Sequence, residues 1–402
     1  MAKTDATPIT SFDHHSVEFA RDPVNTLATL TETAAVHWST AHDGFWVLTR
    51  YEDVATGYRD FETFSSASGV ALPRMPFGRN HIPVTLDPPL HTMHRHMLNP
   101  WFSKASIEQW EPDVRRIIRG FVENMRAQDE FDFVKDLSER VPGTVILTLL
   151  GFEPERQLTF LEAMRRGMEN QGTTDPDMLA EIRRDAEWMH QQILAEAENR
   201  RTEPSEDLMT VLATGTLEDG HRYTDDELID TTMLLLLAGF HTTNAGAAAI
   251  FAHLGRHHDQ RQQLIENPSL IPGAVDELIR IYPPATGFAR TVTKPVDLHG
   301  EQMDEGDSVL MLIAAANNDP RKYADPRQVD FSRNNSRTLT FGWGVHRCLG
   351  FHLARLMLRI EVEEVLGTFP GYEIIEDRVK TSDAMGTGYT HERVPARKTT
   401  HG

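Results

Sequence analysis

The ten residues from Phe341 to Gly350 read FGWGVHRCLG and contain Cys348, the only cysteine of this 402-residue chain. A single thiol has three usual interpretations: it is an inert core residue, a catalytic nucleophile or a metal ligand. The residues around Cys348 help to decide between them.

The glycines at 342, 344 and 350 let the backbone bend sharply and approach a flat partner, because glycine has no Cβ and tolerates positive φ. From Leu349 onward the apolar spacing predicts a helix, with a C-terminal glycine at Gly367. The sulfur of Cys348 would lie at the amino end of that helix, where free N–H groups stabilise a thiolate. Such a sulfur suits iron.

This stretch resembles the cysteine loop of the cytochromes P-450, the haem-thiolate monooxygenases. Every fixed position of the family pattern is filled, by Phe341, Gly342, Gly344, His346, Cys348 and Gly350. The resemblance implies that Cys348 is the axial ligand of the iron of haem b, with Phe341 and Gly350 beside the cofactor. It also implies a mainly α fold with small β-sheets, in which a long central helix lies over the haem and the cysteine loop lies beneath it.

The central helix begins at a capping-box pattern formed by Thr224 and Glu227. Its middle is similar to the oxygen-activation stretch of the family, and Thr242 matches the threonine that hydrogen-bonds dioxygen and helps to deliver protons. The alternative is that the threonine hydroxyl bonds back to a carbonyl one turn earlier and bends the helix. The chain departs from the family at His241, which stands where an acid is usual.

An imidazole has an ordinary pKa of about 6.5 and can relay protons near neutrality. We therefore expect His241 to take part in proton delivery, with a structural role in a solvent channel as the alternative. Because Thr242 is retained, the sequence favours reductive use of dioxygen over peroxide-driven chemistry.

Two more groups of residues carry the resemblance. Glu277 and Arg280 lie three apart on one helical face and resemble the buried Glu-x-x-Arg pair of the family, whose third member we expect at Gln328. Haem propionates seek Arg or His side chains, and the matching positions are His91, Arg95, Arg290 and His346. Each of these also has an ordinary interpretation as a surface or core residue.

The substrate pocket is expected to be apolar. The covering segment between Ser65 and Pro89, the central helix, the segment from Thr286 to Ala289 and the C-terminal tail are its expected walls. The candidate residues are Leu72, Met75, Phe77, Leu236, Gly239, Phe240, Phe288 and Met385.

Composition and charge exclude several classes. With 40% apolar residues the chain can bury a large core, and we expect a single domain over residues 1–402. A net charge of −20 argues against nucleic acid and against anionic membranes. The apolar stretch from Thr231 to Leu254 contains polar residues and predicts a buried helix. One cysteine and no secretory signal predict a reducing cytoplasm.

The secondary-structure pattern divides the chain into three parts. Val36 to Thr40 and Phe45 to Thr49 predict a β-hairpin within a β-rich part over residues 30–60. Helical periodicity dominates residues 91–283. A turn-rich segment then leads to the ligand loop at 341–350, and a strand-like tail follows Pro370.

The resemblance implies insertion of one oxygen atom from dioxygen into a small hydrophobic substrate. Electrons would come from NAD(P)H through a separate ferredoxin and ferredoxin reductase, docked on basic residues near the thiolate. A haem-thiolate enzyme with non-hydroxylating chemistry, a dehydratase, isomerase or gas reductase, is the main alternative. A thiol hydrolase using Cys348 with His346 as base is the other. The expected docking residues are Arg95, Lys104, Arg115, Arg347 and Arg355.

Overall fold

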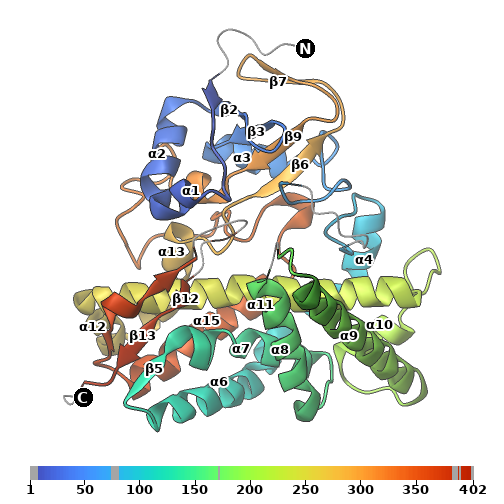
Figure 1. Ribbon diagram of the computed structural model, residues 1–402, viewed down its shortest axis with the longest axis vertical. Helices are drawn as coiled ribbons and strands as arrows, with labels where there is room; N and C mark the ends of the chain where they lie inside the picture. The colour runs from blue at the N-terminus through green and yellow to red at the C-terminus, as the bar shows by residue number, and fades with distance from the viewer. Residues whose placement is uncertain (1–7, 74–80, 171–172, 383–387, 389–390, 400–402) are drawn as a thin grey trace.

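The computed structural model describes residues 8–73, 81–170, 173–382, 388 and 391–399. Figure 1 shows the N-terminal strands gathered at one end and a layer of helices at the other, with helix α11 (Asp225–Arg256) running through that layer. The mainly α architecture with short strands is the expected one.

The helical bulk consists of successive helices joined by short turns. The helices are α1 (Val17–Arg21), α2 (Pro23–Thr33), α3 (Tyr51–Arg59), α4 (Leu90–Leu98), α5 (Lys104–Gln109), α6 (Glu111–Arg126), α7 (Val141–Leu149), α8 (Pro154–Glu169), α9 (Pro176–Thr202), α10 (Leu208–Thr214), α11 (Asp225–Arg256), α12 (His258–Glu266), α13 (Ile271–Ile281), α14 (Ile313–Ala316) and α15 (Phe351–Thr368).

The largest sheet has six strands in the order β1-β2-β3-β9-β6-β4. Its strands are β1 (Ile9–Thr10), β2 (Val36–Ser39), β3 (Phe45–Leu48), β4 (Phe64–Ser65), β6 (Phe288–Val292) and β9 (Ser308–Met311). The expected hairpin is confirmed as β2 and β3, which pair antiparallel with Trp38 opposite Trp46. The turn between them carries positive φ angles at His42, Asp43 and Gly44.

Three smaller sheets complete the β-structure, and the tail after Pro370 supplies four of their strands. The remaining strands are β5 (Glu130–Asp132), β7 (Val296–Leu298), β8 (Glu301–Met303), β10 (Glu373–Ile374), β11 (Lys380–Thr381), β12 (His391–Arg393) and β13 (Pro395–Arg397). The sequence indicates a break in the helical pattern near Gln128, but it did not predict that this break holds β5 and the π-helix that follows at Phe133–Ser138.

Helix α11 starts at the predicted capping box, in which the Thr224 side chain accepts from the Glu227 backbone and the Glu227 carboxylate accepts in return. By length and composition this helix is apolar enough to cross a membrane, but 61% of its most apolar window is buried among other elements. It is therefore packed as a core helix.

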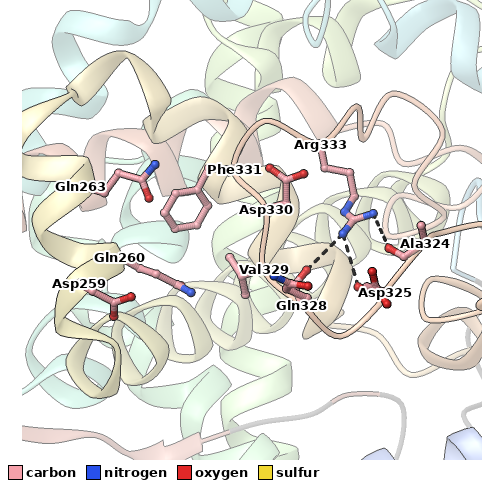
Figure 2. A pocket seen from close by; sticks show the side chains of 10 residues that line it. All are labelled: Asp259, Gln260, Gln263, Ala324, Asp325, Gln328, Val329, Asp330, Phe331 and Arg333. Carbon is pink, nitrogen blue, oxygen red and sulfur yellow. Dashed lines mark hydrogen bonds between the residues drawn. The ribbon is translucent and has the colours of Figure 1, made fainter.

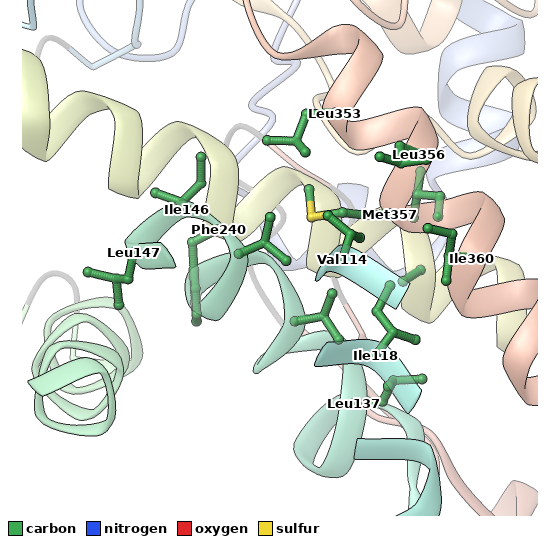
Figure 3. Packing of buried hydrophobic residues seen from close by; sticks show 14 of the residues in the cluster. Val114, Ile118, Leu137, Ile146, Leu147, Phe240, Leu353, Leu356, Met357 and Ile360 are labelled. Carbon is green, nitrogen blue, oxygen red and sulfur yellow. The ribbon is translucent and has the colours of Figure 1, made fainter. Parts of the chain in front are cut away.

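The core lies where α6, α7, α11 and α15 pack on one another. Figure 3 shows side chains of these helices converging, among them Ile118 of α6, Phe240 of α11 and Met357 of α15. Helix α15 begins at Phe351, two residues later than the spacing predicted, and Gly367 lies inside it, since the helix ends at Thr368.

Glu361 of α15 is fully buried, and neither of its carboxylate oxygens has a hydrogen-bond partner. Burial raises the pKa of this carboxyl from 4.5 to about 8. The folded state thus holds a proton that the unfolded chain releases above pH 4.5, so stability falls as pH rises through this range, by on the order of 1 kcal/mol per pH unit.

Glu361→Gln removes the titrating group, and we expect it to flatten this loss of stability between about pH 5 and 8. Urea unfolding at several pH values measures the effect, and Glu123→Gln on the exposed face of α6 is the control. An unchanged slope in Glu361→Gln would contradict the prediction.

Candidate functional site

The cysteine loop folds back on itself before α15. Gly342 and Gly344 have φ angles of +66° and +69°, and a Cβ on Gly344 would lie 2.5 Å from the carbonyl oxygen of Tyr58 at the end of α3. Glycine is required there by both conformation and space. The Cys348 amide donates to the Phe341 carbonyl at 2.8 Å, which closes the loop.

Cys348 lies deep in the molecule and yet has an open surface. Burial raises the pKa of its thiol, while its side chain is not covered by protein atoms. A side chain can lie deep in the fold and still be uncovered when it faces an internal space. Gly350 borders open space too, because a Cβ there would meet no atom within 4 Å. Its φ is −88°, so the role of this third glycine is its missing Cβ and not a positive φ.

The groups opposing the raised pKa of Cys348 are the Gly350 amide, which bonds the sulfur, and the charges of Arg95, Arg347 and Arg355. These are the N–H and cationic contacts that a thiolate ligand needs. The base of a thiol hydrolase is not supplied: Nε2 of His346 lies 3.2 Å from Ser66 Oγ and 3.9 Å from Asp87 Oδ1, on the side facing β4 and α4.

Helix α11 presents a second open surface. Ala238 is exposed and Thr242 is half-buried, whereas residues 243–255 on the C-terminal side are buried. The Thr242 hydroxyl donates to the Ala238 carbonyl at 2.9 Å, which is the back-bonding expected as the alternative. Ala238 and Thr242 lie one turn apart, so they share one face of the helix.

Most residues predicted as pocket walls lie elsewhere. Leu236 and Phe240 are buried in the helical core, on the opposite face of α11 from Ala238, and a Cβ on Gly239 would lie 3.2 Å from Ile146 of α7. Leu72 is buried in the cluster beneath β3 and β9. Phe288 of β6 is half-buried. Met75, Phe77 and Met385 lie outside the described residues.

His241 points toward the C-terminal tail. A Cβ on Gly388 would lie 3.4 Å from Cε1 of His241 and 2.3 Å from the carbonyl of Pro284, so tail, helix and the segment after α13 meet there. Burial lowers the pKa of His241, and the ring is therefore neutral at pH 7.

Four predicted cations come together between α4, β6 and the cysteine loop. The rings of His91 and His346 are 4.2 Å apart. Arg290 is buried and lies over the Tyr58 ring at 5.1 Å. Arg95 donates to the carbonyl of Arg347 at 2.8 Å, the residue before Cys348.

This cluster is short of negative charge. Burial lowers the pKa of His91 to about 4, and burial together with Arg290, His91 and Arg95 lowers that of His346 to about 3. Burial also lowers the pKa of Arg290. The buried Nδ1 of His91 has no hydrogen-bond partner. Two guanidinium groups, those of Arg95 and Arg290, together with two neutral imidazoles and an unused polar atom fit a dianionic ligand, which the two propionates of haem would supply.

Sequence reasoning missed one residue of this cluster, Asp87. Its carboxylate accepts hydrogen bonds from the Ser65 hydroxyl and from the Ser66 amide. Its negative charge partly opposes the lowering of the pKa that burial causes in His91 and Arg290. The available signal was its place in the sequence, four residues before His91.

The Glu277–Arg280 pair is fully buried and bidentate, with Nε–Oε2 and Nη2–Oε1 distances of 2.8 and 2.9 Å. The third member is Arg333, whose Nε donates to Glu277 Oε1 at 3.0 Å. The expected assignment of Gln328 is wrong, because that residue supplies only its backbone carbonyl, to Arg333.

Gln328 instead lines a polar cleft of about 540 Å³, shown in Figure 2. The cleft lies between α12 and the irregular segment from Asp325 to Arg333, which we call the meander. The Arg333 guanidinium reaches carbonyls of Ala324, Asp325 and Gln328 on the wall of the cleft. The lining residues do not include Cys348 or Thr242.

Comparison with known proteins identifies the family of the chain. A family model described as Cytochrome P450 matches residues 33–388. The chain is 30% identical over 366 residues to a protein named Steroid C26-monooxygenase from Mycobacterium tuberculosis, covering 88% of this chain and 90% of that protein. A protein named Beta-dihydromenaquinone-9 omega-hydroxylase, from Mycobacterium bovis, is 29% identical and spans 96% of this chain and 78% of its own length.

Solved structures of similar fold include cytochrome P450 CYP109Q5 from Chondromyces apiculatus, with a TM-score of 0.86 and 28% identity over 96% of this chain and 98% of that one. CYP109E1 from Bacillus megaterium, in complex with corticosterone, has a TM-score of 0.86 and 25% identity over 95% and 99% of the two chains.

The contact between Arg333 and Glu277 can be used to test whether Arg333 or Gln328 is the third member of the Glu277–Arg280 network. Arg333→Ala leaves the buried Glu277 carboxylate short of a cation, and we expect it to lower the free energy of unfolding by about 2 to 4 kcal/mol. Gln328→Ala, on the same meander, keeps the backbone carbonyl and should change it by less than about 0.5 kcal/mol. Equal effects of the two variants in urea unfolding would contradict the assignment.

Proposed function

The chain belongs to the cytochrome P450 family, and we propose on that premise that it inserts one oxygen atom of dioxygen into a small, largely hydrophobic organic substrate. The observation that carries this proposal is Cys348, buried in its loop but open on one side and faced by an N–H group and three guanidinium groups. Haem b bound through this sulfur supplies an electron-rich iron that favours O–O cleavage.

Residues of three elements would hold the cofactor. Cys348 binds the metal, and His91, Arg95, Arg290 and His346 bind the propionates, with Asp87 fixing the position of the Ser65–Ser66 segment beside them. Phe341 and Gly350 border the cofactor from the loop. This division is supported by the two guanidinium groups, those of Arg95 and Arg290, on one side of the site.

Proton delivery is assigned to the open face of α11. The Thr242 hydroxyl holds its proton against the Ala238 carbonyl and is half-exposed. His241 lies beside Gly388 and Pro284, and we assign this residue, which stands where the family has an acid, to proton transfer.

The substrate class rests on the open surface and on the relatives. The face of α11 around Ala238 and the half-buried Phe288 offer apolar contacts. Relatives are named for steroid and menaquinone oxidation, and one structural neighbour binds corticosterone. A small hydrophobic molecule with a rigid or extended hydrocarbon skeleton is the corresponding substrate here.

Electrons are assigned to a ferredoxin, reduced from NAD(P)H by its reductase in the cytoplasm. The expected basic docking patch is largely neutralised: Arg115 pairs with Glu111, Glu363 and Glu364, and Arg355 pairs with Asp276. Lys104 lies 3.6 Å from Glu108. Long-range attraction for an acidic partner is therefore weak on this face.

Oxygen insertion is tested with isotopically labelled dioxygen and a panel of steroid substrates. We expect one labelled atom in the product, a red-shifted carbon-monoxide adduct of the reduced protein, and loss of both in Cys348→Ala. In the same assay His241→Ala should lower product formed per reduced cofactor at least twofold, whereas His37→Ala, remote from α11, should not. A substrate converted without label incorporation would favour a dehydratase or isomerase.

The salt dependence of electron transfer tests the docking surface. With Lys104, Arg115 and Arg355 paired with carboxylates and a net charge of −20, we expect reduction by an acidic ferredoxin to stay constant or to speed up as ionic strength rises from about 0.02 to 0.2 M, because screening relieves repulsion. Stopped-flow reduction measures the rate, with a neutral chemical reductant as the control. A severalfold fall in the reduction rate would contradict this prediction and would indicate that the partner docks on a basic patch.

A further inference from the structure

Asp276 stands immediately before the buried Glu277 on α13 and reaches across to α15. Its Oδ1 lies 2.6 Å from Nε of Arg355, and each side chain is about a quarter exposed, 27% and 26%. Burial raises the pKa of Asp276, and Arg355 opposes that rise. The pair thus ties the helix of the Glu277 network to the second turn after the cysteine loop.

Arg355 also lies against the two aromatic residues that flank Cys348. Its guanidinium carbon is 4.8 Å from the ring centre of Phe341 and 5.7 Å from that of Phe351. The guanidinium carbon of Arg347 also lies over the Phe351 ring, 4.1 Å from its centre. The positive charge of Arg355 is felt at the sulfur, so the guanidinium is held beside the thiolate by a carboxylate on one side and aromatic faces on the other.

We propose that Asp276 and Arg355 are positioning residues that set the electrostatic field at Cys348, with the carboxylate offsetting the guanidinium and so lowering the reduction potential of the bound haem. The inference rests on the proposed function, because it requires haem on Cys348. It assigns to the pair a role in tuning, separate from partner docking and from propionate binding.

The direction follows from charge. Reduction adds one negative charge at the iron and sulfur, which a nearby cation stabilises and a nearby carboxylate opposes. Without Asp276, the Arg355 charge acts unopposed and the potential rises. Without Arg355, the carboxylate remains alone and the potential falls. The loss of one charge at a partly exposed site changes such an equilibrium by a small factor, about two to four.

The experiment measures the haem midpoint potential of the holoenzyme by anaerobic titration. We expect Asp276→Asn to raise it and Arg355→Gln to lower it, each by a two- to fourfold change in the reduction equilibrium, or roughly 20 to 35 mV at 59 mV per tenfold for one electron. The double variant should return close to the wild-type value. Arg355→Lys keeps the charge and should stay near wild type.

A purely structural role gives a different result. Asp276→Asn and Arg355→Gln break the same ion pair, so a structural effect would move both potentials in one direction and would lower thermal stability together with them. Asp113→Asn and Arg116→Gln, which break an exposed Asp–Arg pair within α6, should leave the potential unchanged. Shifts of the same sign, or no shifts in variants that keep the thiolate carbon-monoxide spectrum, overturn this inference alone. Protein without thiolate-ligated haem overturns the proposed function and the inference with it.

Discussion

The buried carboxylate of Glu277 is the interaction on which the cysteine loop depends. It accepts bonds from Arg280, Arg333, Asn335 and the amide of Asp330, and a charge buried so deeply is tolerated only with partners of this quality. Arg280 in turn donates to the Asn317 carbonyl. The Asn317 side chain then binds the Leu339 amide and the Thr340 hydroxyl, the two residues before Phe341. One ion pair therefore leads by direct contacts to the first residue of the loop.

The second constraint is the space left open inside the fold. Helix α11 buries Leu236 and Phe240 on one face and leaves Ala238 and Thr242 uncovered on the other, while Cys348 and Gly350 leave the loop side uncovered. A protein interior is otherwise close-packed. A large, flat, anionic cofactor requires open surface at both places, with buried cations at its border. In the same arrangement, the charges of Arg95, Arg347 and Arg355 set the electrostatic field at the sulfur of Cys348.

The chemistry-bearing residues were the most predictable part of the site. Cys348, Thr242 and the four cations lie in short motifs whose spacing is local, and the capping box and the β2–β3 hairpin obey local rules as well. Arg333 was missed because the meander from Asp325 to Arg333 has no periodicity, so no spacing rule distinguishes it from Gln328. The pocket-wall candidates Leu236 and Phe240 lie on the packed face of α11, opposite the uncovered Ala238, because the pattern of this largely apolar helix does not mark its open side.

By itself the sequence determined the cysteine loop and the glycines that let it turn, the helical start at Thr224 and the mainly α architecture, since each depends on residues near one another in the chain. Only the tertiary structure decided which guanidinium completes the Glu277 network, that Asp87 contacts the segment beside His91 and His346, that Arg115 and Arg355 are paired with carboxylates, and which side of α11 is left uncovered. The physical reason is that ion pairing and burial are set by partners tens to hundreds of residues away, such as Arg115 with Glu364, and no local pattern encodes their distance.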